Sequence, residues 1–284
     1  MKKIMFILLM ALALNSQAKE VLKFIIPNPP GGSGDIITRL IQKNLEDKED
    51  LDIQIVYKPG GFNMVAVNES IVDKSDYVVV LSGPAIYYNS MENEDVAKIV
   101  NRMIPVANVA SVPTALYVNK NSKFKTFQQM YEYSKNNYVN IGSSNIMGKY
   151  VVKEIFPADS KTTIVFYAGD APTSMAVLSN TVDLGMSLYP SITKFTTTKE
   201  VEVLGITQRN TDNIPYVKSM HGDVFIGYFA PPSMSVEKVK KINRWIAESV
   251  NTKEYIDTIT KLGARPVDNS QESFVKTINN IMKK

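Results

Sequence analysis

The sequence of 284 residues contains no cysteine and a single histidine, His221. Without cysteine the chain forms no disulfide, and its N-terminus cannot carry the cysteine-linked lipid of a lipoprotein. A zinc site is excluded in practice, because such sites need several cysteine or histidine ligands. His221 lies in a polar stretch far along the chain from the glycine-rich turns described below, so the sequence gives no support to a histidine-based catalytic triad.

The sequence also lacks a strong charge of either sign. Its 32 Lys and Arg residues against 28 Asp and Glu residues give a formal net charge of +4. Basic and acidic residues alternate, as in residues 43–50. We therefore expect no nucleic-acid partner and no binding to a membrane surface.

The first residues have the layout of a secretory signal. Lys2 and Lys3 precede an apolar run over residues 4–14, and small residues follow up to Ala18. The run is too short to span a bilayer, and the arrangement is typical of a cleaved signal peptide. We expect residues 1–18 to be removed, which lowers the net charge to +2 with the loss of the two lysines. The sequence thus predicts a periplasmic protein without a lipid anchor.

Strands and helices alternate along the rest of the chain. A β-rich run at residues 21–26 is followed by a glycine-rich turn and then by apolar residues at helical spacing. Further strands are predicted at residues 53–57, 77–81, 115–118, 139–141, 163–166, 182–186, 201–207 and 225–230, and helices at 126–135, 148–156, 173–178, 236–250 and 271–282. This alternation predicts an α/β fold with mainly parallel sheets flanked by helices.

Most of the turns made of small residues follow directly after a predicted strand. In open α/β sheets, ligands bind at the carboxyl ends of the strands. Several such turns in one chain predict two lobes with a ligand cleft between them. We place the first lobe at residues 19–114 and 228–284, and the second at residues 115–227.

The most informative turn covers residues 27–35, with sequence Pro-Asn-Pro-Pro-Gly-Gly-Ser-Gly-Asp. Glycines allow close approach of a ligand, and the start of the next helix presents free N–H groups to an anion. Ser33 is a candidate N-cap, and Asp35 and Arg39 have the spacing of an ion pair. Nucleotide-binding patterns are absent, since a third Rossmann glycine would fall on Ile37 and no Gly-Lys-Ser/Thr occurs. From this pattern alone, an anion cradle and a simple tight turn both stay open.

Two turns of similar composition, at residues 142–145 and 167–172, supply hydroxyl and backbone donors in the second lobe. Tyr87, Tyr88 and Tyr189 either line the cleft or pack in the core. A catalytic pair of carboxylates also stays open, because acidic residues are numerous but no spacing singles out a pair.

Seven segments, in order along the chain, carry a resemblance to a known family. They lie at residues 26–35, 58–61, 141–144, 167–172, 181–184, 229–232 and 262–264. With these segments the sequence resembles the Bug-type periplasmic solute-binding proteins of tripartite tricarboxylate transporters over essentially all residues after 18.

The resemblance implies a type II-like periplasmic binding protein fold, with two lobes that close over the ligand. It implies a protein that binds a small mono- or dicarboxylate and delivers it to membrane permease subunits. We expect a monomer without catalysis, metal or cofactor. One ligand carboxylate would lie between residues 30–35 and residues 167–172. The ligand-binding residues implied or inferred are Asn28, Pro30, Gly31, Gly32, Ser33, Gly34, Asp35, Ser82, Ser143, Ser144, Asn145, Lys149, Tyr167, Gly169, Asp170, Ala171 and Pro172.

Four residues depart from the family pattern in segments expected to line the cleft. Asn28 replaces an aromatic residue, Asn145 replaces a glycine, Lys149 lies among small residues, and Ala168 replaces a frequent lysine. We expect Asn28, Asn145 and Lys149 to choose the ligand. Lys149 either pairs with a second ligand carboxylate or is simply solvated.

Three other functions stay open. In the first, the protein binds an amino acid or another anion for a different transporter. In the second, it presents its ligand to a membrane sensor. In the third, a secreted enzyme uses Asp35 or Asp170 on the same two-lobed architecture.

Overall fold

The first lobe is built around β1, which runs directly into the glycine-rich turn. Its sheet has the order β2-β1-β3-β9-β4, with β1, β2 and β3 parallel and with β9 antiparallel to both β3 and β4. The strands are β1 (Glu20–Ile26), β2 (Leu51–Tyr57), β3 (Tyr77–Ser82), β4 (Ile104–Asn119) and β9 (Asp223–Ala230). All six residues of β3 are buried, as expected for a parallel strand with helices on both faces.

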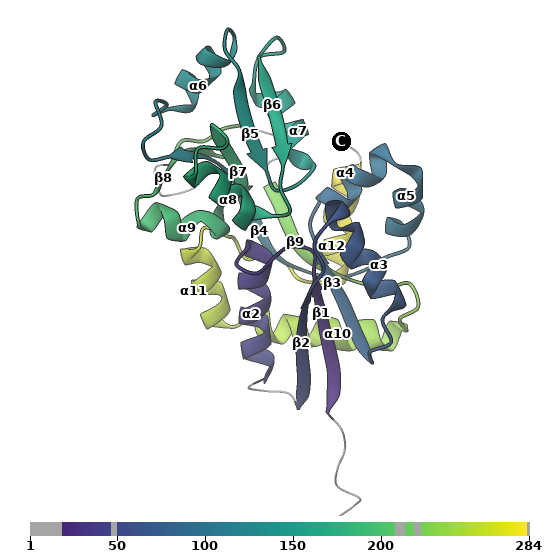
Figure 1. Ribbon diagram of the computed structural model, residues 1–284. Helices are drawn as coiled ribbons and strands as arrows, with labels where there is room; N and C mark the ends of the chain where they lie inside the picture. The colour runs from purple at the N-terminus through teal and green to yellow at the C-terminus, as the bar shows by residue number, and fades with distance from the viewer. Residues whose placement is uncertain (1–18, 47–49, 208–213, 219–222, 283–284) are drawn as a thin grey trace, which may run out of the picture.

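Helices cover both faces of this sheet. One face carries α2 (Ser33–Glu46), α10 (Val236–Val250) and α11 (Lys253–Lys261), and the other carries α3 (Met64–Val72), α4 (Ala85–Glu92), α5 (Glu94–Val100) and α12 (Gln271–Met282) (Figure 1). Phe24 packs in the core of the first face with Trp245, and Ile25 packs in that of the second face with Phe274. Neighbouring residues of β1 point to opposite faces, so this one strand contributes to both cores.

The second lobe repeats this plan. β5 (Val139–Ser143) lies between β6 (Thr162–Phe166) and β7 (Leu184–Leu188), with all three parallel, and β4 pairs antiparallel with β7 and β8 (Val201–Ile206). The flanking helices are α6 (Phe127–Ser134), α7 (Met147–Ile155), α8 (Asp170–Leu178) and α9 (Tyr189–Thr197). The structure therefore confirms the predicted two-lobed α/β fold.

The computed structural model describes residues 19–46, 50–207, 214–218 and 223–282. The predicted signal peptide, residues 1–18, and His221 lie outside these ranges. Among the described residues, no helix has both the length and the apolar character needed to cross a membrane.

The strand β4 joins the lobes and is much longer than the strand predicted at residues 115–118. Its first part pairs with β9 from Ile104 to Pro113, and the rest pairs with β7 and β8. Register shifts between Pro105 and Ala107 and between Asn108 and Ala110 mark bulges, where a strand tolerates proline. These interruptions hid the first part of β4 from the sequence pattern. The lobe boundaries at residues 114 and 228 fall inside β4 and β9 and stay a prediction.

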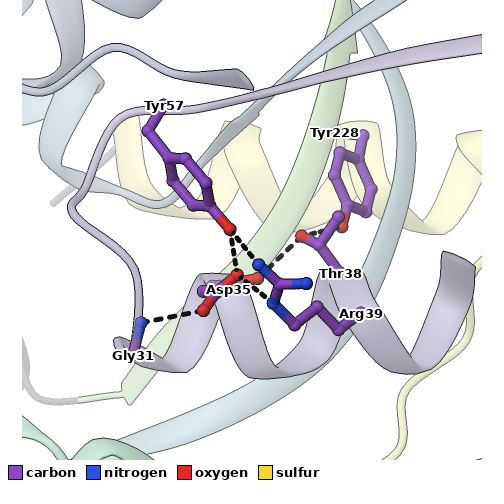
Figure 2. Close-up of polar contacts among 7 residues, drawn as sticks. Gly31, Asp35, Thr38, Arg39, Tyr57 and Tyr228 are labelled. Atoms are coloured by element: carbon purple, nitrogen blue, oxygen red, sulfur yellow. Dashed lines mark hydrogen bonds and ion pairs between the residues drawn. The ribbon is translucent and has the colours of Figure 1, made fainter. Parts of the chain in front are cut away.

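A hydrogen bond in the core ties α2 to the second joining strand, β9. Thr38 Oγ1 lies 2.7 Å from Gly34 O and 2.7 Å from the hydroxyl of Tyr228 (Figure 2). The single proton of Thr38 goes to the Gly34 carbonyl, so Tyr228 donates to Thr38. Both side chains are fully buried, and this pair fixes the helix that carries the glycine-rich turn.

Replacing either member of this pair has unequal consequences. Thr38→Val leaves the buried Tyr228 hydroxyl without an acceptor, which we expect to lower the free energy of unfolding by about 1–3 kcal/mol. Tyr228→Phe leaves Thr38 bonded to Gly34, so the expected loss is about 0.5–1.5 kcal/mol. Urea denaturation measures both. A larger loss in Tyr228→Phe than in Thr38→Val would contradict the assigned donor.

Candidate ligand-binding site

A cavity of about 60 Å³ lies between the lobes, where the glycine-rich turns meet. At about 10–15 Å³ for each water molecule, it has room for a small polar group and a few waters. The first lobe contributes Asn28, Gly32, Ser33, Gly34, Asn63, Leu81, Gly83, Ala85 and Ile226, and the second contributes Ser144, Asn145, Asp170 and Leu188. The cavity thus combines backbone at the start of α2 with polar side chains from both lobes.

An outer recess of about 210 Å³ continues this cavity. The two spaces share Asn28, Asn63 and Ser144, and the recess adds Pro27, Gly60, Gly61, Phe62, Tyr167 and Ala168. Phe62 of the first lobe meets Phe166 of the second edge to face, with ring centres 5.4 Å apart. The site therefore has a polar inner end and a more apolar outer end, a division that suits a small ligand with a polar head.

Ser33 lies at the start of α2, where the helix leaves N–H groups without partners inside the helix. The first bond around this turn runs from Ile36 N–H to Gly32 O (3.1 Å). The Ser33 hydroxyl is buried and has no hydrogen-bond partner among the described residues. The prediction that Ser33 is an N-cap is therefore wrong. Ser33 is the first residue of α2, and its hydroxyl accepts no hydrogen bond from an N–H group of the helix. Instead the hydroxyl is available to a ligand.

Asp35 holds the turn in place from behind. One carboxylate oxygen accepts from Gly31 N–H (2.8 Å), and the other accepts from Arg39 Nε (2.9 Å) and the Tyr57 hydroxyl (2.6 Å) (Figure 2). The predicted ion pair with Arg39 is confirmed. Burial, with the bond to Asp35, raises the pKa of Tyr57, and the charge of Asp35 raises the pKa of Arg39. Asp35 lines neither space, so the structure places it as a support of the turn.

The loop after β5 is held as firmly in the second lobe. Ser143 Oγ donates to Asn145 O (2.9 Å), and Asn145 Oδ1 accepts from Met147 N–H (2.9 Å). A Cβ atom on Gly148 would lie 2.1 Å from Ser143 Oγ, so only glycine allows the loop to close in this way. Ser143 is buried beneath the loop, while Ser144 and Asn145 line the cavity.

Among the described residues, Asp170 is the only acidic or basic residue that lines either space. It lies in the first turn of α8, three residues before the predicted start of that helix, and is 7% exposed. Burial raises the pKa of Asp170, although hydroxyl groups of Ser144 and Ser191 and the backbone of Leu188 and Ser33 oppose the shift. Since Ser33 belongs to the first lobe, this carboxylate faces the start of α2 across the cleft.

Besides Asp35 and Ser143, seven further predicted site residues line neither space. Pro30 and Gly31 are exposed, and Ser82 is buried with its hydroxyl accepting from Asn63 Nδ2 (3.0 Å). Gly169, at φ +127°, lets the second lobe approach the first, because a Cβ there would lie 3.2 Å from Asn28 Nδ2. Ala171 and Pro172 belong to α8, and Lys149 is described below. Their role in ligand binding stays a prediction.

Two of the three tyrosines considered above are core residues, and none lines the site. Tyr87 and Tyr88 are buried on opposite faces of the first lobe. Tyr189 packs against the core of the second lobe and close to Gly263.

Lys149 bridges the lobes instead of lining the cleft. Its ammonium lies 2.7 Å from Glu92 Oε2 at the end of α4, and the Tyr150 hydroxyl donates to the other Glu92 oxygen (2.5 Å). The bonds from Lys149 and Tyr150 lower the pKa of Glu92. The sequence left two roles open for Lys149, pairing with a ligand carboxylate and simple solvation. The contact with Glu92 is neither of these.

The sequence missed the residues that follow the second glycine turn. Gly60, Gly61, Phe62 and Asn63 all have positive φ, from 49° to 120°. For Phe62 and Asn63 this conformation is uncommon, and it is often found where binding requires a particular backbone shape. It places Asn63 in the inner cavity and Phe62 at the recess. The Pro-Gly-Gly sequence at residues 59–61 predicted a tight turn here, but it did not indicate that Phe62 and Asn63 line the site.

Two α/β lobes joined by crossing strands around a polar cleft define the class of two-lobed solute-binding proteins. The chain belongs to the tripartite tricarboxylate transporter family of receptors, which it matches over residues 37–284. It is 22% identical to Protein BugT of Bordetella pertussis over 265 residues, which cover 87% of this chain and 81% of BugT.

Two solved structures of Rhodopseudomonas palustris proteins have the same fold. Rpa4515 with adipate matches with a TM-score of 0.82 and 18% identity, over 95% of each chain. MatC with bound malate matches with a TM-score of 0.79 and 15% identity, over 93% of this chain and 96% of its own. Together they support the type II-like binding-protein fold inferred from the sequence.

Removing the charge of Asp35, which supports the glycine-rich turn, should destabilise the protein. Asp35→Asn removes the negative charge to which Gly31, Arg39 and Tyr57 donate hydrogen bonds. We expect a loss of about 1.5–3 kcal/mol in the free energy of unfolding. Amide exchange at Gly31 should become faster. The matched control is Glu46→Gln in the same helix, an exposed change expected to stay within about 0.5 kcal/mol. Equal stability of the two variants in urea denaturation would show that Asp35 does not hold the turn.

The contact between Glu92 and Lys149 should favour the closed arrangement of the lobes. Because the pKa of Glu92 lies below its ordinary 4.5, its contribution is complete above that pH and disappears as pH falls through the lowered value. Both side chains are more than a third exposed, so its worth is at most about 1 kcal/mol. We expect Glu92→Gln at pH 7 to increase the radius of gyration in small-angle scattering without ligand. Asp95→Asn, which breaks an exposed pair within one lobe, is the control, and equal radii would contradict the prediction.

Proposed function

We propose that this protein is a periplasmic solute-binding protein that captures a small organic carboxylate between its lobes and delivers it to membrane permease subunits. The observation that carries the proposal is the buried, unpartnered hydroxyl of Ser33 at the start of α2, in a cavity between the lobes. A carboxylate accepts hydrogen bonds from this hydroxyl and from helix N–H groups, and the helix dipole favours its charge.

Comparison supports this proposal in two ways. The family is one of receptors for a transporter. The matching structures of Rpa4515 and MatC contain adipate and malate, which are both carboxylates. Removal of residues 1–18, release into the periplasm and a monomeric state belong to the same proposal.

Binding without catalysis is the better account of the acidic residues. A reaction that uses two carboxylates needs both to reach the substrate. Asp170 lines the cavity, but Asp35 lies behind the turn and both of its oxygens already accept hydrogen bonds. Of the two acids named from the sequence, only Asp170 therefore lines the cleft.

A thermal-shift screen of mono- and dicarboxylates, amino acids and inorganic anions tests the function. A ligand at about a hundred times its dissociation constant should stabilise the protein by roughly 2.7 kcal/mol. No stabilisation by any organic anion would remove the proposal, and formation of a product during incubation would replace it with an enzymatic function.

The same screen has a matched pair of variants. Ser33→Ala removes the unpartnered hydroxyl and should weaken the bound anion by roughly tenfold. Ser70→Ala removes a buried helix hydroxyl that bonds only to Val67 O, outside both spaces, and should leave affinity unchanged. Equal affinity of the two variants would show that the anion binds elsewhere.

A further inference from the structure

The lining of the cleft carries one acidic side chain and no basic one among the described residues. In the part of the chain that the structure describes, no lysine or arginine lines the inner cavity or the outer recess, and the single carboxylic acid in their lining is Asp170. Lys149, the candidate partner for a second ligand carboxylate, is engaged by Glu92 outside both spaces. A ligand with two negative charges would therefore find no counter-charge in the lining.

Asp170 also has acceptor capacity left. A carboxylate has about four acceptor positions. Leu188 N–H lies at a long 3.4 Å from Asp170 Oδ1, and the Ser191 hydroxyl donates its one proton to Leu188 O (2.6 Å). Ser144 and the Ser33 backbone are the other donors near it. Asp35 is different, because three strong donors already occupy its two oxygens.

A ligand carboxylate at the start of α2 would lie close to this buried acid. Ser33 takes part on both sides, since its backbone N–H lies near Asp170 and its hydroxyl is free in the same cavity. Two carboxylates in one poorly solvated site repel each other unless a positive group or a proton lies between them. The described residues that line the cavity supply no positive group. Burial, which raises the pKa of Asp170, favours a proton on this acid unless the ligand brings a positive group of its own.

We propose that the ligand is an amino acid with an uncharged side chain, whose carboxylate binds Ser33 and the start of α2 and whose ammonium binds Asp170. This inference rests on the proposed function and narrows it from carboxylates in general to zwitterions. An ammonium donates strong, charge-assisted hydrogen bonds to a buried carboxylate and neutralises the cavity. The outer recess, with Phe62, Tyr167 and neutral Asn63, receives the side chain.

Calorimetric titration with matched ligand pairs tests the proposal on the unaltered protein. Each pair differs only in the amine: leucine against 4-methylpentanoate, phenylalanine against 3-phenylpropanoate, and glutamate against glutarate. We expect at least one neutral amino acid to bind roughly ten- to a hundredfold more tightly than its plain carboxylate. Glutamate should bind more weakly than the neutral amino acids, because its second carboxylate has no partner.

Asp170→Asn separates the role of the acid from the rest of the site. It should remove most of the preference for the amine, since an amide bears no charge to pair with an ammonium. Asp183→Asn is the control in the same lobe. Its carboxylate accepts from Asn140 N–H (2.8 Å) outside both spaces, and the preference should persist. The wild-type comparison alone decides the matter if Asp170→Asn does not fold.

The outcomes separate the two proposals. Plain carboxylates binding the wild type as tightly as their amine-bearing partners would overturn the zwitterion inference and leave the carboxylate receptor intact. Dicarboxylates binding most tightly of all would do the same. No binding by any member of the pairs or of the broader screen would overturn both. A preference for the amine that survives in Asp170→Asn would show that another group recognises the ammonium.

Discussion

The hydrogen bonds accepted by Asp35 hold the backbone before α2 in a single conformation (Figure 2). They join the turn at Gly31, the helix at Arg39 and the next strand at Tyr57. The start of α2 can present its N–H groups and the Ser33 hydroxyl to the cleft only while this turn stays in place. Because both oxygens of Asp35 accept these hydrogen bonds, its carboxylate supports the turn next to the proposed anion site and does not lie in that site.

The second constraint is the pair of strands that joins the lobes. β4 runs from the sheet of the first lobe, where it pairs with β9, into the sheet of the second lobe, so the carboxyl ends of the parallel strands in each lobe meet at one cleft (Figure 1). Contacts made directly between the lobes, such as Phe62 with Phe166 and Lys149 with Glu92, then lie around that cleft. These are contacts that a closing motion would make and an opening motion would break.

The residues that depart from the family pattern lie in different places in the structure. Asn28 and Asn145 line the inner cavity, in keeping with a role in choosing the ligand, whereas Lys149 bridges the lobes. The strongest candidate for selectivity is Asp170, the one acidic side chain among the described residues that line the cleft. The same cleft thus combines the proposed anion site at the start of α2 with the acid that we propose binds an ammonium.

The sequence by itself determined the features that depend on neighbouring residues. Helix periodicity placed the last helix at its observed limits, Gln271–Met282. The helix predicted at residues 126–135 also forms, at Phe127–Ser134, with the Thr126 side chain as its cap. Only the tertiary structure decided that β4 is one long strand, that Ser33 has a free hydroxyl and that Asp170 faces it from the other lobe. The physical reason is the separation along the chain: Ser33 and Asp170 are brought together by the packing of two lobes, and no local pattern records a contact of that kind.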